Sequence, residues 1–157
     1  MSEKVVKSVE TKQYIVVNLG DERFGIDIQY VDNIVRMQRI TRVPKAQPYF
    51  LGVINIRGEI IPVMSLRLKF GLDPDVFSNT TRILIIKLEP QAAIGIIVDE
   101  VKNVITLDEE EIDRFTASGN DEKAAYISGV GKHAEGLVTL LNLNTVIIEK
   151  EAAEKIG

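Results

Sequence analysis

One unit of sequence occurs twice in this chain, and this repeat constrains the fold more than any other feature. Gly25–Ile34 aligns with Gly95–Val104 at a separation of 70 positions, with glycine, valine and asparagine in matching places. Further along, the separation is 77, and Ile60–Leu66 aligns with Leu137–Leu143. The conserved order of the matched segments favours a duplication over chance agreement between two β-rich halves. A duplicated unit of about 65 residues predicts two similar bodies that pack on each other.

Each repeat is rich in short runs of β-branched and aliphatic residues separated by turn residues, which is the pattern of β-strands. Four or five short strands in so small a unit close best as a barrel, because closure removes exposed strand edges. The strands expected in the first repeat are residues 14–19, 23–28, 52–56 and 59–64, and those in the second are residues 81–88, 94–98, 101–107, 127–130 and 136–141.

A few segments predict other local structures. Val31 and Ile34 continue the apolar pattern at a spacing of three, which fits either a short helical turn or a bulged strand. Asp108, with Glu111 three residues later, has the pattern of a capped helix start. The remaining expectations are a helical turn at residues 65–70, one long helix at residues 142–155 with Leu143, Val146, Ile147 and Ile148 buried, and a loose tail at residues 1–12.

The composition is that of a soluble globular protein, with 45% hydrophobic and 27% charged residues among 157. The formal net charge of −4 argues against nucleic acid or an anionic membrane as the main partner, since both require a basic face. No apolar run is long enough to span a bilayer, and the N-terminal residues do not have the pattern of a signal peptide. A cytoplasmic protein without direct membrane contact is therefore expected.

The sequence offers little for catalysis. There is no cysteine, and the single histidine, His133, lies in a loop-like segment where solvation is the plain interpretation. Metal clusters need more ligands of these types than the chain has, unless the site is built from carboxylates alone. Asp27 and Asp99 fall in expected strands but not at matching positions of the repeat, so nothing pairs them as acid and base. The sequence thus predicts no enzyme, no cofactor and no metal site.

If chemistry is absent, the surfaces must carry the function. Arg57 stands next to Gly58 at an expected hairpin tip, where asparagine or aspartate would suit the turn better. It is either a solvated turn residue or a contact. The long loops at 36–50 and 108–126 carry apolar residues in polar company, which either seal the barrel ends or dock a partner.

Three segments of the chain resemble those of a known protein family. They are Phe24–Ile28, the run Gly52–Val63 that contains Asn-Ile-Arg-Gly, and Gly95–Asp99. In these residues the chain closely resembles the CheW-like family of bacterial chemotaxis coupling proteins. The resemblance runs from about Gln13 to Ile148 with the segments in family order, and it favours a stand-alone coupling protein over the related regulatory domain of the kinase CheA or the coupling module of CheV.

The resemblance implies a fold, a function and partners. The fold would be all-β, with two tandem five-stranded SH3-like barrels side by side and a C-terminal helix. The protein would be a non-catalytic adaptor that bridges the cytoplasmic hairpin tips of chemoreceptors to CheA, joining its regulatory domains in membrane-associated arrays. Receptor contacts are carried over to Ile28, Val31, Asn33 and Arg57, with the receptor helix in an apolar groove between the barrels, and kinase contacts to Met37, Ile40, Val43, Pro44 and Phe115 at the barrel ends.

The expected domain organisation is a single CheW-like domain at residues 13–150. Its first barrel would take roughly residues 13–80 and its second roughly residues 81–145, and the sequence leaves open whether strands cross between them. Two alternatives compete with the adaptor: a nucleic-acid- or ligand-binding tandem barrel, and an enzyme with a carboxylate pair that the pattern does not reveal.

Overall fold

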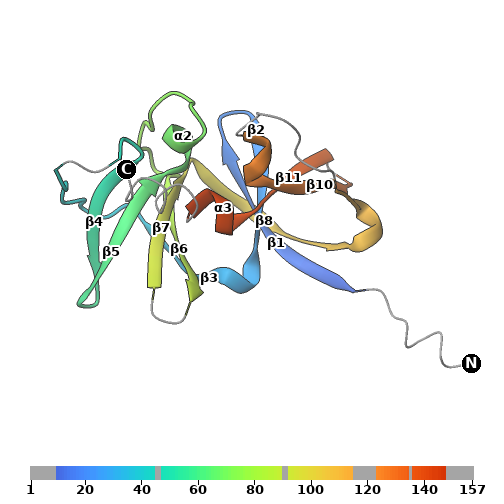
Figure 1. Cartoon of the computed structure of the whole chain (residues 1–157), viewed down its shortest axis with the longest axis horizontal. Coiled ribbons are helices and arrows are strands. Elements are labelled where there is room, and N and C mark those ends of the chain that lie inside the picture. Colours follow the sequence, from blue (N-terminus) through green and yellow to red (C-terminus); the bar gives the residue numbers. More distant parts are fainter. Residues whose placement is uncertain (1–9, 45–46, 90–91, 115–122, 135, 148–157) are drawn as a thin grey trace, which may run out of the picture.

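The computed structural model describes residues 10–44, 47–89, 92–114, 123–134 and 136–147. These residues form two β-sheets with a few short helices (Figure 1). The earlier elements are β1 (Thr11–Leu19), β2 (Glu22–Asp27), the 3₁₀ turn η1 (Ile28–Tyr30), β3 (Val31–Arg36), β4 (Phe50–Ile56), β5 (Glu59–Ser65) and α2 (Leu66–Lys69). The later ones are β6 (Arg82–Glu89), β7 (Ala92–Val98), β8 (Glu100–Asp108), η2 (Glu109–Glu111), β9 (Ile112–Asp113), η3 (Lys123–Tyr126), β10 (Ile127–His133), β11 (Gly136–Leu141) and α3 (Leu143–Ile147).

Each sheet forms one barrel. The five-stranded sheet, in the order β3-β6-β7-β5-β4, is barrel 1, and the six-stranded sheet, in the order β8-β1-β2-β11-β10-β9, is barrel 2. The two barrels lie side by side, with barrel 1 on the left of Figure 1. The prediction of an all-β fold of two SH3-like barrels with a C-terminal helix is confirmed. Barrel 2 has a sixth strand because the two-residue β9 pairs with β10.

The sheets do not follow the order of the repeats. The hairpin β1–β2 comes from the first repeat but pairs with β8 and β11 of the second. Conversely, the hairpin β6–β7 of the second repeat pairs with β3 and β5 of the first. Each barrel therefore contains a hairpin from one repeat and the later strands of the other, which is the strand exchange that the sequence left open.

The same strand order and register recur in both barrels. The parallel pair β5–β7 places Val63 opposite Gly95, and the parallel pair β11–β2 places Leu140 opposite Gly25 at the equivalent positions. Both glycines leave room for neighbouring side chains: a Cβ on Gly25 would lie 2.7 Å from Leu140 Cδ2, and a Cβ on Gly95 would lie 2.8 Å from Ile83 Cγ2. The matched glycines of the repeat thus have a common packing role.

The largest hydrophobic cluster of the described residues lies between the barrels. We call it the inter-barrel core. It joins strands of both barrels with both α-helices, so the barrels are held together by a core larger than the interior of either one. Its buried members are Ile15, Val17, Leu19, Phe24, Ile26, Met64, Leu66, Phe70, Leu84, Ile86, Ile96, Val98, Tyr126, Leu141, Leu143 and Val146.

The inter-barrel core explains why two strands are apolar at consecutive positions. In β1, Tyr14 and Val16 face the interior of barrel 2, whereas Ile15 and Val17 face the inter-barrel core. The four central residues of β6 alternate in the same way between barrel 1 and the inter-barrel core. A strand that is covered on both faces loses the usual alternation of apolar and polar residues.

The short helical turns lie at or next to the segments where the sequence predicts them. Val31 and Ile34 both lie in β3, which has a register shift between Val31 and Asn33, so the structure shows the bulged strand and not the helical turn. A 3₁₀ turn, Ile28–Tyr30, directly precedes this strand. The helical turn after Ser65 is confirmed, with Ser65 as its N-cap. Asp108 and Glu111 form the predicted capping box, but the turn that they cap is a three-residue 3₁₀ helix followed by β9.

The C-terminal helix is described only in its first part. α3 spans Leu143–Ile147, with Leu143 and Val146 buried as predicted and Ile147 partly exposed. The rest of the predicted helix at 148–155 and most of the predicted tail at 1–12 lie outside the described residues.

An ion pair fastens barrel 2 to barrel 1 beside the inter-barrel core. Arg67 of α2 donates to both carboxylate oxygens of Asp99, with distances of 2.9 Å from Nε and 2.6 Å from Nη2. The same carboxylate accepts a hydrogen bond of 2.7 Å from the backbone N–H of Gly20 in the β1–β2 turn. These bonds, led by that from Arg67, hold the pKa of Asp99 below its usual value. Two elements of different barrels therefore share one carboxylate.

We expect Asp99→Asn to lower the free energy of unfolding by about 1–2 kcal/mol at pH 7, because a charge-assisted bidentate contact is lost. A lowered pKa in the folded state means that this stabilisation is complete above about pH 5 and is lost as the pH falls through the folded pKa. Urea unfolding at pH 7 and at about pH 3 measures the effect, and the gap between wild type and variant should narrow at the lower pH. Asp73→Asn is the control, since Asp73 is exposed and contacts Arg67 through its main-chain carbonyl. A gap that persists unchanged in acid would refute the role of the charge.

Candidate protein interaction surfaces

The described residues contain no group of three or more histidine, cysteine, aspartate or glutamate side chains that could hold a metal ion. Asp27, at the end of β2, and Asp99, between β7 and β8, both have local structural roles. Asp27 caps η1 by accepting from the Gln29 N–H at 3.1 Å and lies 3.6 Å from Lys12 Nζ, whereas Asp99 is bound by Arg67. His133 lies at the end of β10 and is half-buried. Two surface depressions are the candidate sites for contacts with other proteins.

The first depression is an apolar groove beside the inter-barrel core, with a volume of about 250 Å³. We call it the inter-barrel groove. Its walls come from β5 and the β6–β7 hairpin of barrel 1 and from α3, which follows the last strand of barrel 2. Small side chains on β7 keep it open. Its lining residues are Pro62, Leu88, Glu89, Ala92, Ala93, Ile94 and Ile147.

The predicted receptor residues are only partly brought together. Ile28 and Val31 pack against the inter-barrel core, as do Leu88, Ile94 and Ile147 of the inter-barrel groove, although they do not line the groove themselves. Asn33 is half-buried, and its side chain accepts from the Ile34 N–H at 2.8 Å. Arg57 stands apart at the tip of the β4–β5 hairpin, which lies on the same lower edge of Figure 1 as the start of β3.

The backbone at Arg57 is unusual. Its φ is +53°, and Arg57 is the only non-glycine residue with positive φ among those the structure describes. With Gly58 at +86°, it forms the two-residue turn with left-handed geometry that favours Asn-Gly over any arginine. The turn is supported by Asn55, whose side chain accepts from the Gly58 N–H at 2.9 Å. The arginine side chain is exposed, so the turn does not need it.

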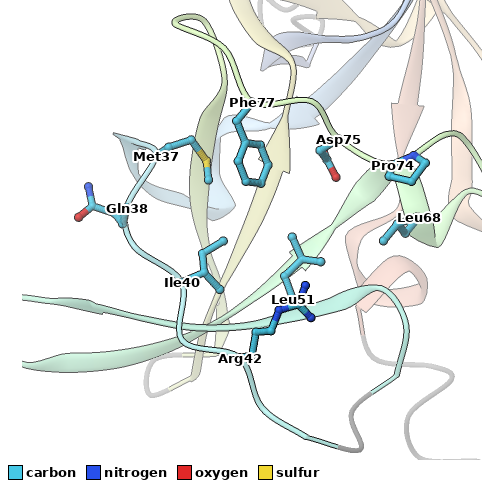
Figure 2. Close-up of a pocket in the computed structure, with 9 residues that line it drawn as sticks. All are labelled: Met37, Gln38, Ile40, Arg42, Leu51, Leu68, Pro74, Asp75 and Phe77. Atoms are coloured by element: carbon cyan, nitrogen blue, oxygen red, sulfur yellow. The ribbon is translucent and has the colours of Figure 1, made fainter.

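The second depression, of about 470 Å³, opens at the end of barrel 1 and is shown in Figure 2. We call it the barrel-end pocket. The predicted kinase residues Met37 and Ile40 line it. Val43 and Pro44 are exposed further along the same loop and do not line it, and Phe115 lies outside the described residues. The pocket is completed by Gln38, Arg42, Leu51, Leu68, Pro74, Asp75 and Phe77.

Sequence reasoning missed the side of the barrel-end pocket that comes from the segment between α2 and β6. Phe77 is half-exposed and faces Met37 across the pocket in Figure 2. The sequence feature that could have indicated this side of the pocket is Phe77 itself, a single aromatic residue in the polar segment 71–80. This segment is anchored by Asp75, whose carboxylate accepts a hydrogen bond from the buried Ser65 hydroxyl. Burial raises the pKa of Asp75 above its usual value despite that bond.

Comparison with known proteins places this architecture in a family. The family model described as "CheW-like domain" matches residues 13–151. The chain is 35% identical to the chemotaxis protein CheW of Helicobacter pylori over 138 residues, covering 88% of this chain and 82% of the relative. It is 32% identical to CheW of Bacillus subtilis over 143 residues, covering 91% and 90%.

A solved structure agrees with the sequence comparisons. The scaffolding protein TtCheW from Thermoanaerobacter tengcongensis superposes with a TM-score of 0.80 at 31% identity, covering 90% of this chain and 95% of that protein. At this level of identity and coverage, both the fold and the family are shared. The chain belongs to the CheW-like family of chemotaxis scaffold proteins.

Proposed function

We propose that this chain is a non-catalytic adaptor that couples the cytoplasmic tips of chemoreceptors to the regulatory domain of the histidine kinase CheA. The observation that carries the proposal is the presence, on a CheW-like fold, of two separate depressions that include or adjoin the residues assigned to the two partners. No helix of the described part of the chain is long and apolar enough to cross a membrane. In this proposal the protein is cytoplasmic and reaches membrane-associated arrays through its partners.

The inter-barrel groove suits a helix of the receptor tip. A receptor tip is a helical hairpin, and an apolar groove accepts the apolar face of a helix. Ala92 and Ala93 allow the helix backbone to approach closely, and Leu88 and Ile94 supply apolar contacts. Arg57, at the hairpin tip, would add a charge-assisted hydrogen bond to a receptor carboxylate or a helix carbonyl, worth about 1–3 kcal/mol.

The barrel-end pocket suits an apolar anchor of the kinase regulatory domain. Met37, Leu51 and Phe77 supply an apolar lining, and methionine adapts its shape to a partner side chain. The inter-barrel core and the Arg67–Asp99 pair hold the two barrels in one arrangement. A change in receptor state would therefore reach the kinase as a coupling free energy of about 1–3 kcal/mol through the scaffold, with no covalent step.

We expect Arg57→Ala to weaken binding of a receptor-tip fragment about tenfold without lowering the melting temperature. Arg57→Asn is the sharper variant, because asparagine suits positive φ and should keep or raise stability while binding is still lost. Calorimetric titration and thermal unfolding of the same samples measure the two effects. Unchanged affinity in both variants would remove Arg57 from the receptor contact.

We expect Phe77→Asp to weaken binding of the CheA regulatory domain at least tenfold, since a charge replaces an apolar anchor in the barrel-end pocket. Val76→Asp is the matched control: Val76 is the neighbouring residue, it is 86% exposed, and it does not line that pocket. Surface plasmon resonance with the immobilised regulatory domain compares the two variants. Equal losses in both would mean that the pocket is not the contact.

The proposed function is tested by asking whether the chain recruits the kinase. CheA is sedimented with receptor-bearing membranes in the presence and absence of the purified protein. We expect the protein to raise the bound fraction of CheA severalfold and to sediment with the same membranes. If the bound fraction of CheA is the same with and without the protein, the coupling role is wrong.

A further inference from the structure

The sequence repeat relates the inter-barrel groove to a second location on the molecule. The separations of 70 and 77 that align the repeats assign each groove residue a counterpart. Five of the seven residues that line the inter-barrel groove have counterparts that line two adjoining depressions, which also border the inter-barrel core. The pairs are Pro62 with Thr139, Ala92 with Glu22, Ala93 with Arg23, Ile94 with Phe24, and Ile147 with Phe70.

These two adjoining depressions share Glu22, and we call them together the second groove. Its apolar part has a volume of about 220 Å³, close to the 250 Å³ of the inter-barrel groove. The floor is an aromatic row in which the rings of Phe24 and Phe70 lie 5.6 Å apart and those of Phe70 and Tyr126 lie 5.5 Å apart. Leu72 and Ile127 complete the apolar part, and Asp21, Arg23, Gly136, Leu137 and Thr139 line the polar part.

The second groove offers apolar surface beside an acidic lip. Leu72 is 36% exposed and Leu137 is 64% exposed, so apolar side chains are within reach of a partner. Where the inter-barrel groove has Ala92, the second groove has the exposed carboxylate of Glu22, next to exposed Asp21. The nearby cations are less accessible: Arg23 is half-buried, and Lys69 lies over the rings of Tyr49 and Tyr126.

We propose that the second groove binds an amphipathic helix whose apolar face rests on Phe70 and Leu72 and whose flanking lysine or arginine pairs with Glu22. The shape argument is the equivalence with the inter-barrel groove, so to this extent the inference rests on the proposed function. The charge argument is independent of it, because it rests on the exposed carboxylates of Glu22 and Asp21 beside the apolar part of the second groove. The chain then holds two helices against one core, in two grooves that the sequence repeat relates to each other.

The test uses the full-length protein labelled with ¹⁵N and a designed 18-residue helical peptide with leucine on one face and lysine on the flanks. A second peptide has glutamate in place of lysine. We expect the lysine peptide to shift the amides of Phe24, Leu72 and Tyr126, and the glutamate peptide to bind at least tenfold more weakly. Leu72→Glu should weaken the lysine peptide tenfold or more, and Glu22→Gln severalfold, whereas Pro62→Glu in the inter-barrel groove should leave these shifts unchanged.

Leu72→Glu also separates docking from simple charge attraction, since it adds negative charge and would strengthen a purely electrostatic contact. Because Leu72 is partly exposed in a loop, we expect the variant to fold; Leu72→Asn gives a neutral alternative with the same expected loss. Shifts confined to the inter-barrel groove, or affinity that Leu72→Glu does not reduce, would overturn the proposal. A parallel titration with a receptor-tip fragment tests the inter-barrel groove alone, so either proposal can fail while the other stands.

Discussion

Replacing Gly52 by alanine is expected to lower the free energy of unfolding by about 3 kcal/mol or more, which corresponds to a fall in melting temperature of about 10 °C. Gly52 has a φ of +145°, a backbone conformation that residues other than glycine rarely adopt. A Cβ at this position would also lie 2.1 Å from the carbonyl oxygen of Thr41. Thr41 and Val53 exchange two backbone hydrogen bonds of 2.8 and 2.9 Å, which close barrel 1. The variant must either break this closure or push the loop away.

Gly71→Ala is the matched control. Gly71 also has positive φ, at +77°, but a Cβ there would meet nothing within 4 Å. We expect it to cost about 1 kcal/mol from backbone strain alone. Urea unfolding of both variants separates the steric contact from the strain. If the two variants lose the same stability, the close approach of Gly52 to Thr41 is not what makes this glycine necessary.

The Gly52 substitution also has a consequence for binding. Thr41 lies in the same loop as Met37 and Ile40, which line the barrel-end pocket. In the folded fraction of Gly52→Ala, affinity for the kinase regulatory domain should therefore fall, while affinity for a receptor-tip fragment should be kept.

Neither half of the chain is expected to fold alone. A fragment of residues 10–80 retains β1 and β2 without β8 and β11, and it retains β3 and β5 without β6 and β7. Each sheet then loses its central pairings, and the inter-barrel core, to which both halves contribute, cannot form. We expect the fragments 10–80 and 81–157 to be unfolded separately, because the remaining strands cannot bury enough apolar surface.

Mixing the two fragments should restore the fold, since every strand pair is then available. Circular dichroism and amide NMR spectra of each fragment and of the mixture measure this. The whole chain should unfold in one transition that all probes report together. A cooperative unfolding transition in either isolated fragment would show that the domain divides near residue 80 after all.

Much of the fold could be predicted because the local patterns are strong. The runs at Tyr14 and Ile83 are apolar at successive positions, and the Arg57-Gly58 turn separates two clear strands. The exchange of hairpins could not be read from these patterns, since β1 and β6 have almost the same apolar character and either repeat could pair with either hairpin. The choice between these pairings is made by packing over the whole inter-barrel core.

The candidate surfaces were predicted less completely. Met37 and Ile40 could be found because they are apolar residues in an expected loop, and both line a pocket. Leu51 and Leu68 could not, since a strand or helix residue that borders a cavity has the same sequence pattern as one that is fully packed. The exposure of Arg57 could be predicted from its place in a turn. Its positive φ could not, because the Arg-Gly pair does not by itself determine the turn type.

The most direct test of the two-sided adaptor is an NMR titration of the labelled protein, first with the purified CheA regulatory domain and then with a receptor-tip fragment. We predict two separate sets of shifted amides. The kinase domain should shift Met37, Ile40 and Phe77 at the barrel-end pocket, and the receptor fragment should shift Leu88 and Ile94 at the inter-barrel groove, together with Arg57. The second partner should bind while the first remains bound. Shifts from neither partner, or competition of both for one surface, would contradict the account.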